Sequence, residues 1–224
     1  MSAPARAAGP HPMGLLLAAL LLAAPLGADP TMERTDGLPP DLPDWLSPLL
    51  DPAGYRVVRD EGEPVEFWFP PALPMQDPSA ELGVEYPTLP PGGLVGVVRT
   101  TGPWSTYKAQ IVPPGTYTLR YAVQPADGDH TGQTWFRDFL LLIPIALDNF
   151  DPYGVPEQEP LVEASNTIIE GATHPMTMAL FQNYDGAESA TMFWNDLGQP
   201  TLAVPLGDVT LGLVIEGQGE EVPL

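Results

Sequence analysis

The amino-acid sequence predicts an all-β fold, a single antiparallel β-sandwich of jelly-roll-like type with one short helix and proline-rich loops. Thirty prolines and 22 glycines among 224 residues exclude a helical bundle, a coiled coil or a Rossmann-type fold, which tolerate few such breaks. Short runs of β-branched and aromatic residues recur between the breaks, some with a period of two. Because 44% of the residues are hydrophobic, the chain has enough apolar side chains for a core.

The first 28 residues are expected to be a signal peptide outside the fold. Residues 14–24 form an apolar run, about half the roughly 20 residues that span a bilayer. Pro25 ends this run, and the small residue Ala28 lies where cleavage is expected. We therefore expect a secreted or periplasmic protein that begins near Asp29 and does not insert into a membrane, while an uncleaved anchor stays the alternative.

Residues 29–52 are rich in proline and acids, and we expect a partly ordered arm that precedes a single β-sandwich domain of residues 53–224. Within the domain, the sequence predicts strands over residues 55–59, 65–69, 94–100 and 107–112. Residues 70–93 contain seven prolines and no periodicity, which predicts a long surface excursion.

Residues 116–124 carry the clearest strand pattern of the chain. Tyr117, Leu119 and Tyr121 alternate with Thr118 and Arg120, as the two faces of a half-buried strand do. This assignment predicts that Leu119→Ala destabilises the fold by about 2–5 kcal/mol and Thr118→Ala by well under about 1 kcal/mol.

The second half of the domain is expected to combine a central strand, a short helix and a final group of strands. Residues 136–143 are apolar on both faces, which predicts a strand covered on each side. Leu161, Ala164 and Ile168 have helical spacing, and this helix is expected to end at Gly171. The remaining predicted strands are residues 176–180, 192–194, 202–206 and 209–215.

Charge and cysteine content exclude several classes of function. Twenty-nine acidic residues against eight basic ones give a net charge of −21, which argues against nucleic acid as a partner. The chain has no cysteine, which excludes disulfides, thiol catalysis and iron–sulfur clusters. An exported chain without cysteine is typical of a bacterial envelope.

Four segments together resemble a known group of proteins. They are GTYTLRY in residues 115–121, DGDH in residues 127–130, RDFLLL in residues 137–142 and THP in residues 173–175. In this order they are similar to a family of uncharacterised exported bacterial β-sandwich proteins. The resemblance covers residues 94–180 and implies secretion and a β-sandwich, and it carries no catalytic residues with it.

The candidate site residues are Asp127, Asp129, His130, Asp138 and His174. The two histidines are expected to be the only ones of the mature chain, and together with carboxylates they form a ligand set for a divalent transition metal. We expect the two imidazoles to lie within roughly 5 Å, with Asp138 orienting one of them. The alternative is that these residues serve only as turn and loop residues.

Two other binding chemistries stay open, and serine catalysis has no supporting motif. Calcium would suit the acidic loops of the chain, although these loops do not match an EF-hand pattern. Trp104, Trp135 and Trp194 lie near turns and are candidates for a sugar-binding platform, unless they fill the core. The sequence thus predicts a non-enzymatic binding or envelope module with an unknown protein or glycan partner. The alternative is a metal-binding protein or metal-dependent enzyme centred on His130 and His174.

Overall fold

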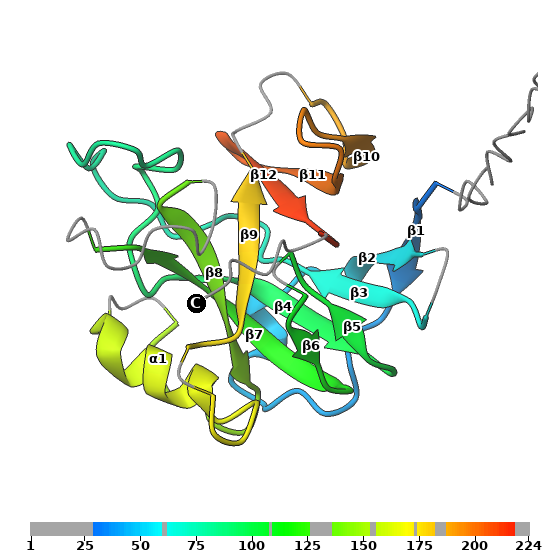
Figure 1. The fold of residues 1–224 in the computed structure, drawn as a ribbon, viewed down its shortest axis with the longest axis horizontal. Coiled ribbons are helices and arrows are strands. Elements are labelled where there is room, and N and C mark those ends of the chain that lie inside the picture. The colour runs from blue at the N-terminus through cyan, green and yellow to red at the C-terminus, as the bar shows by residue number, and fades with distance from the viewer. Residues whose placement is uncertain are drawn as a thin grey trace, which may run out of the picture.

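The computed structural model is an all-β, sandwich-like fold with one short α-helix (Figure 1), which confirms the predicted fold class. It describes residues 29–59, 62–107, 109–125, 136–152, 156–172, 174–181 and 187–217. The first six strands are β1 (Thr31–Asp36), β2 (Ala53–Val58), β3 (Val65–Trp68), β4 (Leu94–Thr100), β5 (Trp104–Ser105) and β6 (Ile111–Val112). The others are β7 (Gly115–Val123), β8 (Asp138–Pro144), β9 (Thr177–Phe181), β10 (Thr191–Trp194), β11 (Pro200–Leu206) and β12 (Val209–Val214), and helix α1 covers Gln158–Asn166.

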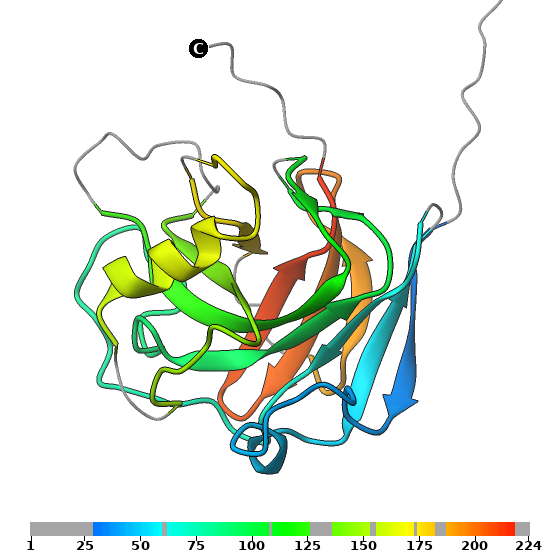
Figure 2. The same ribbon diagram turned by 90° about the horizontal axis from the view of Figure 1, so that it is seen from below.

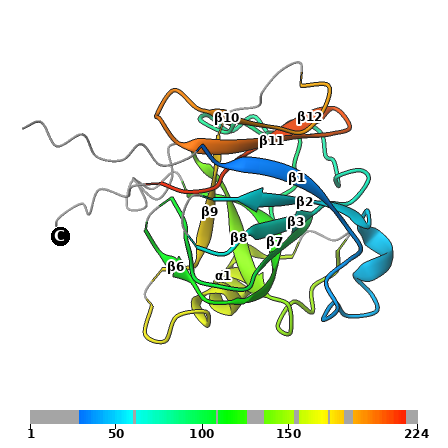
Figure 3. The same ribbon diagram turned by 90° about the vertical axis from the view of Figure 1, so that its right-hand side faces the viewer.

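Ten strands form one antiparallel sheet in the order β1-β2-β3-β4-β7-β8-β9-β12-β11-β10, and β5 pairs with β6 in a separate hairpin. The chain follows sheet order up to β9, and the last three strands then return so that β12 pairs with β9, as in a Greek key. The sheet curls until its two edge strands, β1 and β10, lie next to each other (Figure 3). At this seam Trp194 Nε1 donates a hydrogen bond to Asp29 Oδ1 over 3.1 Å.

The main core lies on the concave side of the curled sheet. Tyr117, Leu119 and Tyr121 of β7 point into it, as the alternation predicted. The core also takes side chains from β2, β3, β4, β8, β9, β11 and β12, so the two halves of the sheet pack face to face. Burial of so many apolar side chains is the main stabilising contribution to the fold.

The convex side of the sheet is covered in three separate places. Residues 38–50, including a 3-10 turn at Ser47–Leu49, pack on β3 and β4. Helix α1 packs on β7 and β8 through Leu161 (Figure 2). Tyr107, Phe136 and Phe193 lie over β9 and β12. Strand β8 is therefore buried on both faces, as the apolar run of residues 136–143 predicted.

The expectation that β7 is only half buried is wrong. Thr118 and Arg120 point to the convex side, yet both side chains are completely buried. Arg120 Nη2 lies 2.7 Å from Asp148 Oδ1 and Arg120 Nε lies 2.9 Å from Asp148 Oδ2, so the guanidinium group and the carboxylate form a bidentate ion pair. The Thr118 hydroxyl donates to the same carboxylate. The small cost expected for Thr118→Ala therefore no longer holds.

Residues 29–52 are joined to the sheet more closely than the term arm suggests. Strand β1 pairs with β2 along its whole length. Leu46 and Leu50 are buried against Trp68, whose indole Nε1 donates to the Gly37 carbonyl oxygen over 2.9 Å. The remaining helix prediction holds in part, since α1 ends at Asn166 and a turn continues to Gly171, where φ is +76°. Among the described residues, no helix has the length and apolar character needed to cross a membrane.

The buried ion pair yields a stability prediction. Arg120→Met leaves the Asp148 carboxylate buried without its cation, and we expect it to lower the free energy of unfolding by about 3–5 kcal/mol. Thr118→Ala removes one donor from the same carboxylate and is expected to cost about 1–3 kcal/mol. The double variant Arg120→Met/Asp148→Leu should recover much of the Arg120→Met loss, because no unpaired carboxylate is left.

Urea unfolding of each purified variant measures these free energies. The control is Arg34→Met, because Arg34 is exposed and its guanidinium group lies over the Tyr55 ring, so its loss should cost less than about 1 kcal/mol. Equal effects of Arg34→Met and Arg120→Met would contradict a structural role for the buried pair.

Candidate functional site

The proline-rich loop of residues 70–93 folds back on itself and forms the wall of a pocket. Gln76 N donates to Thr88 O over 2.9 Å, and Ser79 N donates to Pro87 O over 2.8 Å. The Gln76 side-chain amide also donates to the carbonyl oxygens of Pro87 and Leu89. These bonds join the two limbs of the loop, which the sequence predicted only as a surface excursion.

Asp138 fixes the middle of this loop to the sheet. Its side chain is fully buried at the start of β8, opposite Val123 of β7. Asp138 Oδ2 accepts a hydrogen bond from Glu85 N over 2.8 Å, and Oδ1 accepts from Tyr86 N over 3.0 Å. The Tyr121 hydroxyl donates to Oδ1 over 2.5 Å. Three donors therefore converge on one carboxylate, two of them from the loop backbone.

Tyr86 links the loop to the far half of the sheet. Its hydroxyl donates to Phe181 O over 2.6 Å and accepts from Gly212 N over 2.9 Å, which links the loop to β9 and β12. Burial is the main cause that raises the pKa of Tyr86, and the pKa of Tyr121 rises through burial and through its hydrogen bond to Asp138. Both phenols consequently keep their protons and act as permanent donors.

The end of the loop is also attached to β7 by hydrogen bonds. Gly92 N donates to Tyr121 O over 2.6 Å, Tyr121 N donates to Gly93 O over 3.0 Å, and Arg120 Nη1 donates to Gly92 O over 3.0 Å. Gly92 has a φ of +85°, and a Cβ atom there would lie 2.8 Å from Pro156. Glycine is required at this position by both the backbone conformation and the close approach.

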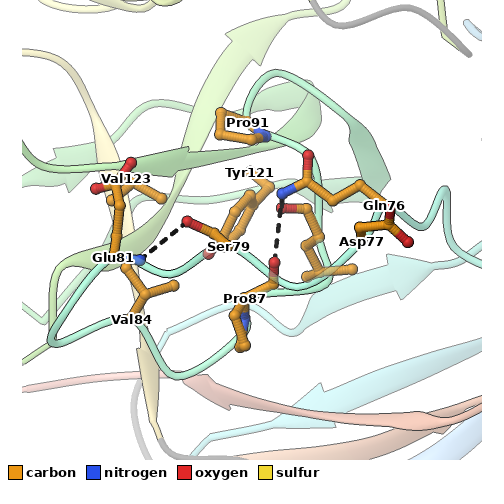
Figure 4. A pocket seen from close by; sticks show the side chains of 10 residues that line it. Gln76, Asp77, Ser79, Glu81, Val84, Pro87, Pro91, Tyr121 and Val123 are labelled. Atoms are coloured by element: carbon orange, nitrogen blue, oxygen red, sulfur yellow. Dashed lines mark hydrogen bonds between the residues drawn. The ribbon is translucent and has the colours of Figure 1, made fainter.

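Between the loop and β7 lies a pocket of about 340 Å³, which we call the loop–sheet pocket (Figure 4). Tyr121 and Val123 of β7 contribute to it from the sheet, and all its other lining residues come from the loop. The polar lining side chains are Gln76, Asp77, Ser79, Glu81 and Tyr121, and the apolar ones are Val84, Pro87, Leu89, Pro91 and Val123.

The lining of the loop–sheet pocket is rich in hydrogen-bond acceptors and negative in charge. Asp77 and Glu81 supply two carboxylates, and no lysine or arginine is among the described lining residues. Arg137 lies behind the loop, where its Nη2 is 2.8 Å from Glu81 Oε2 and its Nη1 donates to Leu82 O over 2.9 Å. This arginine neutralises part of the Glu81 charge, and the carboxylates of Asp77 and Glu81 are both exposed.

The metal-ligand prediction is not tested by the described residues. Asp127, Asp129 and His130 lie outside them. His174 is exposed in the segment before β9, and Asp138 uses its carboxylate to hold the loop of residues 70–93. Over the part of the chain that the structure describes, no three metal-ligating side chains gather in one place. The shared site of His130 and His174 stays a prediction.

One of the three tryptophans proposed for a sugar-binding platform is in the core. Trp104 is fully buried, and its indole Nε1 donates to Ile215 O over 2.7 Å, so the core alternative holds for this tryptophan. Trp135 lies outside the described residues. Trp194 is 53% exposed at the seam between β1 and β10, away from the loop–sheet pocket.

Comparison with known proteins adds no further information. No family model, no curated protein and no solved structure matches this chain. The chemistry of the loop–sheet pocket therefore has to be inferred from its own residues.

Sequence reasoning named Asp138 but gave it a different role. The sequence did contain a signal for this role. An acidic residue next to an apolar strand is buried if the strand includes it, and a buried carboxylate needs hydrogen-bond donors. The donors from Glu85 and Tyr86 lie more than 50 residues away in the chain. No local pattern indicates that these backbone amides reach Asp138.

The Asp138 network yields a second stability prediction. In Asp138→Asn, an amide NH₂ group faces at least one of the three donors that bond to the carboxylate, so that donor loses its acceptor. We expect a loss of about 1–3 kcal/mol in the free energy of unfolding. Tyr121→Phe removes a hydrogen bond to a charged group and should cost about 1.5–3 kcal/mol. Hydrogen exchange at the Glu85 and Tyr86 amides should become faster in Asp138→Asn.

The matched control is Asp77→Asn, the same change at an exposed carboxylate of the same loop, which should stay within about 0.5 kcal/mol of the wild type. Unchanged protection of the Glu85 and Tyr86 amides in Asp138→Asn would refute the anchoring role.

Proposed function

We propose that the protein is an exported, non-enzymatic binding module and that the loop–sheet pocket is its ligand site. The observation that carries this proposal is a pocket of about 340 Å³ whose loop wall is fixed by buried hydrogen bonds to Asp138. Pockets of roughly 300–1,000 Å³ with a few placed polar groups are typical of ligand sites. A wall that is already ordered avoids the entropy cost of ordering on binding.

The lining determines the chemistry of the ligand. Asp77, Glu81, Gln76 and Ser79 bring side-chain oxygens that accept hydrogen bonds, and two carboxylates repel anions. The ligand is therefore rich in donors and carries no negative charge. The hydroxyl groups of a glycan and the cationic side chains of a protein partner both meet this requirement, and the experiment below separates them.

The polar groups of the pocket are occupied in ways that suit binding better than catalysis. The Ser79 hydroxyl oxygen accepts a hydrogen bond from Glu81 N over 3.2 Å, which gives it a role in the turn of the loop. Glu81 is paired with Arg137. A catalytic serine would need its hydroxyl group paired with a base within hydrogen-bond reach.

A ligand screen tests this proposal. We expect the mature chain to bind a member of a panel of neutral oligosaccharides and of lysine- or arginine-containing peptides, measured by calorimetry. Asp77→Arg should weaken that binding by at least about tenfold, because it places a cation and a long side chain in the acceptor-rich pocket. Mass spectrometry should find the bound compound chemically unchanged after prolonged incubation.

The control is Asp208→Arg, the same charge change in the exposed turn between β11 and β12, which should bind as the wild type does. Equal binding by both variants, or conversion of the ligand to product, would overturn the proposal. Metal analysis of the same protein, purified without a histidine tag, separates it from the metal-dependent alternative at His130 and His174.

Export is supported by the apolar run of residues 14–24, which is followed by Pro25 and Ala28. We expect the intact mass of the protein recovered from a bacterial periplasm or culture medium to correspond to a chain that starts at or near Asp29. Recovery of the exported protein with Met1 still present would contradict signal cleavage.

A further inference from the structure

The side-chain hydrogen-bond donors of the loop–sheet pocket are mostly used inside the protein. Gln76 Nε2 carries two hydrogens, and it donates to Pro87 O over 3.3 Å and to Leu89 O over 3.2 Å. The Tyr121 hydroxyl donates to the buried carboxylate at the start of β8. Among the described side chains that line the pocket, the Ser79 hydroxyl is therefore the one donor left for a ligand.

The backbone of the lining offers few donors as well. Pro87 and Pro91 have no backbone N–H group. The backbone N–H groups of six other lining residues donate within the protein, and these residues are Gln76, Ser79, Glu81, Leu89, Tyr121 and Val123. A ligand group that accepts hydrogen bonds would lose its bonds to water here without replacement, which weakens binding. Sugar hydroxyl groups and peptide carbonyl groups are acceptors of this kind.

The two carboxylates of the pocket lie at its opposite ends, Glu81 at one and Asp77 at the other (Figure 4). They are four residues apart in the loop, which corresponds to at most about 14 Å of extended chain. The rings of Pro87 and Tyr121 lie between them in Figure 4. Arg137 is bonded to Oε2 of Glu81, and a carboxylate can accept further donors. The pocket thus has a negative charge at each end and apolar groups between them.

We propose that the loop–sheet pocket binds an aliphatic polyamine, with one ammonium group at Asp77 and another at Glu81. A polyamine consists of methylene and ammonium groups, so it brings donors and no acceptor to an acceptor-rich lining. Its methylene stem can pack on the apolar groups between the carboxylates, as the stem of a lysine side chain does on apolar surface. The net charge of −21 also attracts a multiply charged cation to the protein. This assignment rests on the proposed function, since it names the ligand class of the same pocket.

Calorimetric titration of the mature chain with simple amines at physiological salt tests this assignment. Spermidine has an ammonium group at each end of a long stem, octylamine has a stem of similar length with one ammonium group, and putrescine has two ammonium groups on a short stem. We expect spermidine to bind at least about tenfold more tightly than either of the others, because it alone reaches both carboxylates. Equal binding of spermidine and octylamine would overturn the proposal.

Isosteric variants locate the site. Asp77→Asn and Glu81→Gln each remove one charge from the pocket, and each should weaken spermidine binding by at least about tenfold. The control is Asp208→Asn, the same change at the exposed turn between β11 and β12, which should bind spermidine as the wild type does. Equal weakening by Asp77→Asn and Asp208→Asn would indicate a general attraction of cations and would overturn the proposal.

The result for the ligand class can be distinguished from the result for the pocket itself. If spermidine does not bind, but an oligosaccharide or basic peptide binds in a manner that Asp77→Arg weakens, the polyamine assignment is wrong and the loop–sheet pocket remains the ligand site. If none of these compounds binds, both proposals are wrong.

Discussion

The arrangement of the loops depends on two adjacent residues in the middle of β7. Arg120 and Tyr121 point to opposite faces of the sheet, and each binds a buried carboxylate from another part of the chain. Arg120 pairs with Asp148 on the convex side, and Tyr121 donates to Asp138 on the concave side. Because neighbouring strand residues face opposite ways, one short segment secures the connection after β8 on one face and the loop of residues 70–93 on the other.

Buried polar groups of this kind specify an arrangement more than they stabilise it. Burying an ion pair costs desolvation energy, which the attraction between the two charges only roughly offsets. Apolar packing, in contrast, stabilises the fold without selecting one loop conformation. In the loop of residues 70–93, the seven prolines have no backbone N–H group, which interrupts any regular strand ladder. The amides of Glu85 and Tyr86 meet Asp138, and the backbone of Gly92 and Gly93 meets β7. These few contacts hold the loop wall of the loop–sheet pocket in place.

The sequence predicted the scaffold well because the evidence for it is local. Alternation over residues 116–124 and apolar runs such as 136–143 place β7 and β8 and show which side chains enter the core. Burial of the second face of β7 could not be predicted, since it depends on a loop that returns 28 residues later in the chain. The same limit applies to Asp138, which the sequence shows as an acid beside a histidine-containing loop. Two of its three partners are backbone amides, which leave no trace in the residue pattern.

The curled sheet also protects the protein from other copies of itself. A ten-stranded sheet has two edges, and unpaired edges are templates on which other chains can add strands. Here β1 carries Glu33, Arg34 and Asp36 along one edge, β10 is only four residues long, and the two strands face each other across the contact of Asp29 with Trp194. Charges, shortness and mutual shielding are recognised defences of natural sheets against edge-to-edge aggregation. The geometry of the sheet and its charges thereby protect this strand-rich chain, which has no cysteine, against aggregation.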